Sequence, residues 1–203
     1  GTEKVEEEIA GQFPAVKVER LDFDTARTRT AYERIISDFE KGKTQILIGT
    51  QMLSKGLDFG NVSVVGILSA DSLMNFPDFR AHERAYQLMV QVSGRAGRRD
   101  KRGTVILQTT QPEHPLIRMV QHFAYKEMVS LQLSERSMFR YPPYYRLIVL
   151  ILRSRNEEAL QEMSALYAEK LRARLGERVL GPVTPPITRV QTLHIKKIVL
   201  KIE

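Results

Sequence analysis

Two glycines and two arginines alternate at the end of residues 91–98 (QVSGRAGR). A pair of guanidinium groups can neutralise the charge that spreads over phosphoryl oxygens during nucleotide hydrolysis, and Arg suits this better than Lys because it binds in bidentate fashion. The glycines allow a tight turn, so that Arg95 and Arg98 can reach one cleft. The alternative is a basic loop on a solvated surface, continued by the cations of residues 99–102. The short motif alone leaves both interpretations open.

A second candidate loop lies in residues 46–59 (ILIGTQMLSKGLDF). Its apolar start is typical of a buried strand, and the polar part begins at Thr50 and Gln51. Open α/β sheets bind ligands at the carboxyl ends of their strands, which is where this loop starts. Thr50 can donate to a phosphate, and Asp58 can accept from a ribose hydroxyl. The alternative is an ordinary polar turn that caps a helix.

Strands and helices alternate in the part of the chain that must position these loops. The spacing of apolar residues predicts strands at 16–21, 45–49, 62–68 and 103–108. Helices are expected at 2–11, with Thr2 as N-cap, at 28–41, with Gly42 as stop, and at 79–93. This order predicts an α/β domain over residues 1–113, with helices on both faces of a parallel sheet.

The pattern changes at residue 114. We expect a helical connector over 114–143, with a helix to about Phe139 and a stop at Pro142 and Pro143. Strands at 145–152, 179–180 and 195–202, with a helix at 156–175 capped by Asn156, then give the order β-α-β-β. That order is most of a split βαβ unit, so residues 144–203 are expected to form a smaller, incomplete α+β domain.

Composition excludes several classes of protein. The 203 residues carry a net charge of +7, no cysteine and four histidines, which excludes disulfides and predicts no metal site in this chain. No apolar run approaches the roughly 18 residues of a membrane helix, so no membrane partner is expected. Residues 1–113 hold 16 basic and 16 acidic residues, and the whole excess lies in 114–203. This asymmetry indicates a small-ligand site in the first part and contact with a polyanion in the second.

Gly42, Lys43 and Thr44 look like the end of a phosphate-binding P-loop, but Ser37 stands where that motif needs glycine. A helix is predicted before them and a strand after them, the reverse of a P-loop. We therefore predict half of an ATPase site at most, and no ATP hydrolysis by this chain alone. Neither end has the pattern of a natural terminus, so we expect a fragment of a longer protein.

The two loops together resemble a known pair of motifs. T-x5-G-x-D at 50–58 followed by Q-x2-GR-x-GR at 91–98 is similar to motifs V and VI of superfamily 2 helicases, whose second RecA-like lobe would be residues 1–113. Other segments resemble the primosomal replication-restart helicases, the PriA (primosomal protein N′) family. These are GTEKVEEEI at 1–9, SADSLMNFPDFRAHERAYQL at 69–88, QPEHP at 111–115, YPP at 141–143 and LGPV at 180–183.

The resemblance implies an ATP-dependent 3′→5′ DNA helicase that recognises stalled or forked DNA and restarts replication by primosome assembly. Arg98 would be the arginine finger on ATP and Mg²⁺ held by a first lobe, and Arg95 its companion. The expected nucleotide-binding residues are Gln91, Gly94, Gly56 and Asp58. Zinc is expected only in a Cys-ligated segment upstream of Gly1.

The expected partners are forked and single-stranded DNA, single-strand DNA-binding protein and primosome proteins, with the protein a cytoplasmic monomer. The DNA contacts are expected at Thr2, Thr50, Gln51, Lys55, Arg189, Lys196 and Lys197. Lysines and arginines suit phosphates, although lysines in an edge strand also prevent aggregation. The aromatic and basic residues at 139–146 can stack on bases, or pack inward as a rigid connector.

Three points stay open. The parent protein can instead be an RNA helicase or a branch-migrating translocase of the same superfamily. It can also be a non-catalytic nucleic-acid-binding module that keeps a RecA-like fold. The role of residues 77–84 is not assigned, and spacing alone favours a salt-bridged helix involving Asp78, Glu83 and Arg84.

Overall fold

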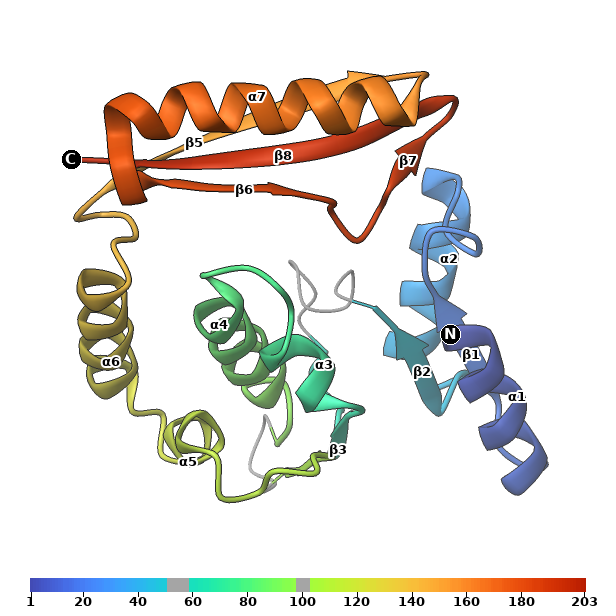
Figure 1. The fold of residues 1–203 in the computed structure, drawn as a ribbon. Coiled ribbons are helices and arrows are strands. Elements are labelled where there is room, and N and C mark those ends of the chain that lie inside the picture. The colour runs from blue at the N-terminus through green and yellow to red at the C-terminus, as the bar shows by residue number, and fades with distance from the viewer. Residues whose placement is uncertain (51–58, 98–102) are drawn as a thin grey trace. The chain divides into compact units, whose positions relative to one another are not determined.

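The computed structural model describes residues 1–50, 59–97 and 103–203, and these fall into two compact units, Gly1–Met128 and Val129–Glu203 (Figure 1). The functional boundaries expected near residues 113 and 143 remain predictions, because a compact unit and a functional domain need not end at the same residue. None of the described helices is long and apolar enough to cross a membrane.

The first unit is an α/β arrangement with two parallel strand pairs. Its elements are α1 (Thr2–Gln12), β1 (Val18–Leu21), α2 (Arg29–Glu40), β2 (Ile46–Gly49), β3 (Val64–Ile67), α3 (Ala70–Met74), α4 (Ala81–Ser93), β4 (Thr104–Leu107) and α5 (Pro115–Gln121). β1 pairs with β2 from Val18↔Ile46, and β3 pairs with β4 from Val64↔Thr104. Parallel strands need a crossover, which α2 provides for the first pair and α3 with α4 for the second. The α/β fold and the order of the four predicted strands are confirmed.

The core around α2 explains why this helix forms and where it ends. Ile35 and Ile36 are buried against Leu21 and Phe59. The side chain of Thr28 caps the helix by accepting a hydrogen bond from the Ala31 amide, and a left-handed Gly42 (φ +71°) follows the C-cap. The helix stop predicted at this glycine is therefore confirmed.

The contacts of Thr44 are those of a structural residue and not of a phosphate-binding P-loop. Its side chain is buried, and its hydroxyl donates to the Glu19 carboxylate in β1. Lys43 pairs with Asp38 at 3.3 Å, and the order is helix, turn, strand. These side chains serve the fold, as the sequence predicts.

Two local expectations were wrong, and one short helix was missed. Thr2 is the first residue of α1 and not its N-cap, which is Gly1. The single helix expected from 114 to 139 is two helices, α5 and α6 (Tyr125–Met138), and the break lies at Phe123, which adopts a left-handed conformation (φ +51°). No glycine or proline marks this break, so its sequence gives no signal. The short α3 was not expected either.

The second unit is a helix on an antiparallel sheet. After α6, which begins in the first unit, come β5 (Arg146–Ser154), α7 (Glu157–Leu175), a 3₁₀ turn (Gly176–Arg178), β6 (Val179–Val183), β7 (Arg189–Val190) and β8 (Leu193–Ile202). The strand order is β5-β8-β6, and the short β7, which the sequence did not predict, pairs with β8.

α7 covers one face of this sheet (Figure 1). Ala168 packs with Val179, Ile198 and Leu200 in a buried cluster. The Asn156 side chain accepts from the Ala159 amide, so the predicted cap of α7 is confirmed. Apart from the short β7, the order β-α-β-β agrees with the split βαβ pattern.

Candidate functional site

The first predicted loop continues directly from α4. Gln91 lies exposed in the last turn of this helix, and Gly94 is its C-cap. The amides of Gly94 and Arg95 donate to the carbonyls of Val90 and Val92, each over 3.0 Å. The backbone that carries Arg95 is therefore fixed by the end of α4.

The next residues of this loop pack against two other segments. The Gly97 amide donates to the Val62 carbonyl over 3.0 Å, and Gly97 has a left-handed backbone (φ +78°). A Cβ atom on Gly103 would lie 2.3 Å from the Gly97 nitrogen and 2.6 Å from the Ala96 Cβ. Real Cβ atoms essentially never come that close, so position 103 requires glycine. Sequence reasoning missed this residue, because its only signal is a glycine before a strand.

One donor atom of Arg95 has no partner within residues 1–50, 59–97 and 103–203. Its side chain is partly buried, and among the residues that the structure describes its Nε atom is buried with no hydrogen-bond partner. Buried polar atoms are nearly always paired, so such an atom calls for an explanation. A guanidinium in this state fits an anionic oxygen, and phosphate is the anion expected at this loop. Arg98, the other predicted cation, lies outside the described residues.

The second predicted loop follows β2, as expected. Thr50 is exposed immediately after Gly49, at the carboxyl end of this parallel strand. Of the other predicted residues in this loop, none belongs to the described part of the chain; they are Gln51, Lys55, Gly56 and Asp58. Their roles remain predictions.

Thr2, a predicted DNA contact, takes part in a hydrogen-bonded cluster. Its hydroxyl donates to the buried carboxylate of Asp22 over 2.7 Å. The other oxygen of Asp22 accepts from the amides of Asp24 and Thr25, at 3.0 and 3.1 Å. The bond from Thr2, these amides and the charge of Arg20 hold the pKa of Asp22 below its ordinary value, against the opposing effect of burial.

Two carboxylates hold the segment between β3 and α4, whose last residues belong to the unassigned stretch 77–84. Asp71 accepts from the Thr109 hydroxyl at 2.8 Å and the Thr110 amide at 2.9 Å, which joins the residues after β3 to those after β4. These bonds lower the pKa of Asp71. Asp78 accepts from the Arg80 amide and pairs with Arg84 at 3.0 Å. The last contact supports a salt-bridged helix start.

The three basic residues predicted for the second unit do not share one face of its sheet. Lys196 and Lys197 are neighbours in β8, so their side chains point to opposite faces. Lys196 lies on the face covered by α7, because Ile198 on that face packs with Ala168. Arg189 is paired with His194 and so lies on the side of Lys196. Lys197 lies on the other face.

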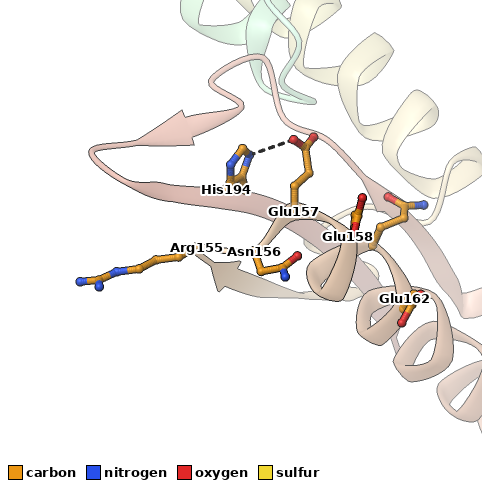
Figure 2. Close-up of a pocket in the computed structure, with 7 residues that line it drawn as sticks. Arg155, Asn156, Glu157, Glu158, Glu162 and His194 are labelled. Atoms are coloured by element: carbon orange, nitrogen blue, oxygen red, sulfur yellow. Dashed lines mark ion pairs between the residues drawn. The ribbon is translucent and has the colours of Figure 1, made fainter.

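The end of the α7 face next to Arg189 is acidic. His194 lies in a pocket at the start of α7, and its Nδ1 is 3.5 Å from the Glu157 carboxylate (Figure 2). The residues that line the pocket are Arg155, Asn156, Glu157, Glu158, Gln161, Glu162 and His194. The three carboxylates outnumber the one guanidinium of Arg155 and repel phosphate, so this pocket is a poor place for a nucleic-acid backbone.

The opposite face of the sheet carries other basic side chains. Arg153 is paired with Ile195, so its exposed side chain lies on the face of Lys197. Lys201 lies there too, but its ammonium donates to the Phe139 carbonyl at 2.5 Å and sits 3.9 Å from the centre of the Tyr141 ring. Burial and the nearby charge of Arg140 lower the pKa of Lys201. Lys197 and Arg153 are therefore the cations best suited to phosphate here; sequence reasoning missed Arg153 because the strand was predicted to end at Leu152.

Part of the aromatic segment at 139–146 packs inward. Tyr141 lies beneath Lys201, in agreement with a connector, while Phe139 and Tyr144 are about half exposed. No group of three or more potential metal ligands occurs among the residues described by the structure.

Comparisons with known families cover most of the chain. The profile described as "Helicase conserved C-terminal domain" matches residues 2–100, and "Primosomal protein N C-terminal domain" matches residues 137–203. Among solved structures, the C-terminal domain of the DEAD-box protein Dbp5 has a TM-score of 0.45 and 19% identity, covering 66% of this chain and 78% of its own.

Relatives named replication restart protein PriA match nearly the whole chain. The protein of Bacillus subtilis is 42% identical over 99% of this chain and 25% of its own length. The corresponding values are 39%, 99% and 24% in Synechocystis, and 36%, 99% and 31% in Treponema pallidum. The chain thus spans a quarter to a third of the length of these relatives.

Proposed function

The chain belongs to the PriA family of replication restart proteins, and from this premise we propose that it supplies the second lobe and the basic C-terminal part of an ATP-dependent 3′→5′ DNA helicase acting at stalled or forked DNA. The observation that carries this proposal is the buried Nε of Arg95, which has no hydrogen-bond partner among the described residues and lies in a loop inside the helicase-matched segment. A cation placed in this way suits a nucleotide phosphate.

In this proposal the loop after α4 acts on the nucleotide. ATP with Mg²⁺, bound chiefly by a first lobe outside this chain, supplies the phosphoryl group. Arg98 and Arg95 stabilise the charge on its oxygens, and Gln91 orients the nucleotide or water. The turn at Gly94, together with the close packing of Gly97 on Gly103, fixes the backbone on both sides of Arg95. Gly56 and Asp58 lie near the ribose of the nucleotide and couple nucleotide binding to DNA binding.

The DNA contacts are proposed in two places. Thr2, Thr50, Gln51 and Lys55 contact the backbone of the tracked strand. In the second unit we place the phosphate contact on the face of Lys197 and Arg153, because the Arg189 side lies next to the Glu157 pocket. Arg189 and Lys196 then contribute less to DNA binding than the sequence alone suggests.

Other features belong to the longer protein. We propose that it works in the cytoplasm as a monomer, together with single-strand DNA-binding protein and primosome proteins. Zinc is placed in a segment outside this chain, in agreement with the absence of cysteine from these 203 residues.

The choice of nucleic acid tests this function. ATP hydrolysis by the full-length parent is measured with forked DNA, Holliday junctions and RNA duplexes. Forked DNA is expected to stimulate hydrolysis most. Preferential stimulation by RNA or by Holliday junctions would contradict the proposal and favour another superfamily 2 enzyme. No hydrolysis with any of them would favour a non-catalytic binding module.

A further inference from the structure

The turn that precedes α4 exposes an aromatic ring and a cation to which the proposed function gives no role. Residues 76–80 have the sequence FPDFR and join α3 to α4, and we call them the FPDFR turn. Phe76 is 58% exposed, and Arg80 is exposed at the N-cap position of α4. A single exposed ring is common on protein surfaces, so the surroundings of this turn decide what it can bind.

Asp78 fixes the backbone of the FPDFR turn. Its amide donates to the Phe76 carbonyl and its carboxylate accepts from the Arg80 amide, each over 2.8 Å. The other carboxylate oxygen pairs with Arg84 at 3.0 Å, so the charge of Asp78 is neutralised within the segment. Because the turn is already ordered, a ligand that binds there loses little free energy to ordering it.

The guanidinium of Arg80 lies over a ring and has no acidic partner in the described part of the chain. Its Cζ atom is 5.1 Å from the centre of the Phe79 ring. No carboxylate of residues 1–50, 59–97 and 103–203 forms a salt bridge with it. A contact with the face of a ring orients the planar group and leaves its N–H donors available. Phosphate is an anion that suits such a planar fork.

The FPDFR turn lies at the edge of the sheet where a ligand is expected. β3 and β4 are parallel, and α4 must run back from the carboxyl end of β3 to the start of β4, so α4 begins at the carboxyl edge. The bonds from Thr109 and Thr110 to Asp71 join the segments that follow the two strands at this edge. Open α/β sheets bind ligands there. Thr50, a proposed DNA contact, also follows the carboxyl end of a parallel strand.

We propose that the FPDFR turn binds single-stranded DNA, with Phe76 stacked on a base and Arg80 on a backbone phosphate. Every base has a face on which a ring can stack, and a cation beside the ring follows the backbone, so this combination binds single strands without reading their sequence. Bases within a duplex are stacked on one another, so the exposed ring selects an unpaired base. The proposal rests on the proposed function, which supplies DNA as the ligand.

Phe76→Leu tests the stacking, because it removes the planar ring and keeps an apolar side chain. The affinity of the full-length parent for an oligo(dT) single strand is measured by fluorescence anisotropy without ATP. Affinity is expected to fall roughly 5- to 100-fold, with the slope of log affinity against log salt unchanged, since stacking releases no counterions. Phe76→Tyr keeps a ring and should bind like wild type. Phe123→Leu, at a ring that is 59% exposed, is the matched control and should also bind like wild type.

Arg80→Gln tests the phosphate contact in the same titrations. Loss of one contact with a single strand lowers the salt slope by about 0.7, and this decrease is expected for Arg80→Gln. Arg118→Gln is the matched control, because Arg118 is also exposed but pairs with Glu113. Its slope should stay at the wild-type value.

Three results overturn the proposal. The first is wild-type affinity of Phe76→Leu for the oligonucleotide, and the second is an equal loss in Phe123→Leu. The third is reduced ATP hydrolysis by Phe76→Leu and Arg80→Gln with unchanged DNA affinity, which means that another part of the polypeptide occupies the turn. Failure of forked DNA to stimulate wild-type hydrolysis rejects the proposed function instead, and the binding measurements, which need no ATP, distinguish the two failures.

Discussion

The hydroxyl of Thr2 donates a 2.7 Å hydrogen bond to the buried carboxylate of Asp22, and so ties the first turn of α1 to the turn after β1. The same carboxylate accepts from the amides of Asp24 and Thr25. A hydroxyl that donates one bond can still accept others. Thr2 therefore has a structural role that is compatible with its proposed contact with DNA.

Replacing Thr2 by valine keeps the shape of the side chain and removes the donor. Since hydrogen bonds to charged groups contribute more than neutral ones, we expect the free energy of unfolding to fall by about 1.5 kcal/mol. Urea denaturation of the chain measures this. Thr30→Val, at an exposed position of α2, is the control and should change little. Equal effects of the two variants would contradict a specific role for Thr2.

Stability should depend on pH through Asp22. Folding lowers the pKa of Asp22 from its ordinary value of 3.8. The ionised carboxylate therefore stabilises the fold when the pH is above 3.8, and this contribution is lost as the pH falls through the pKa of the folded state. Asp22→Asn should therefore destabilise the chain at neutral pH, and its difference from wild type should stay constant until pH falls below 3.8 and then shrink. Thermal unfolding from about pH 7 to about pH 3 is the measurement. A difference that does not shrink would show that Asp22 does not titrate as described.

Gly103→Ala should displace the backbone of Ala96 and Gly97, which follow Arg95. Its new Cβ would meet the Gly97 nitrogen at 2.3 Å, and backbone cannot yield as a side-chain end can. We expect a lower melting temperature and reduced DNA-stimulated ATP hydrolysis in the full-length parent. Gly66→Ala, in β3, is the control because a methyl group added there would meet nothing within 4 Å. Full activity of Gly103→Ala would show that the loop tolerates movement.

Lys197→Gln and Lys196→Gln should differ in DNA binding, because the two side chains lie on opposite faces of the sheet. Loss of one phosphate contact lowers the slope of log affinity against log salt by about 1. This decrease is expected for Lys197→Gln and not for Lys196→Gln. Fluorescence anisotropy of the full-length parent on forked DNA at several salt concentrations measures it. The reverse order would move the DNA to the face of α7.

The sequence predicted regular elements better than the contacts between them. Apolar periodicity placed α2 and α7 within a residue or two, and the cap of α7 at Asn156 was predicted from residue type, whereas the cap of α2 at Thr28 was not. The break at Phe123 was not, because its left-handed backbone depends on tertiary packing.

For the candidate site, the sequence predicted the types of residue but not the contacts between them. Arg95 was correctly placed in a turn after a helix, whereas the requirement for Gly103 comes from a contact six residues away in sequence with Gly97. Lys196 and Lys197 look equivalent by residue type, but strand alternation separates them. The acidic pocket beside His194 arises from segments far apart in the chain.

Arg98 is proposed to act on ATP held by another lobe. The most direct measurement is DNA-stimulated ATP hydrolysis by the full-length parent carrying Arg98→Ala, with Arg99→Ala as the neighbouring control. An arginine finger contributes roughly 10³–10⁵ to turnover, so hydrolysis should be abolished by Arg98→Ala while fork binding is retained, and Arg99→Ala should remain active. Unchanged ATP turnover in Arg98→Ala would contradict the account.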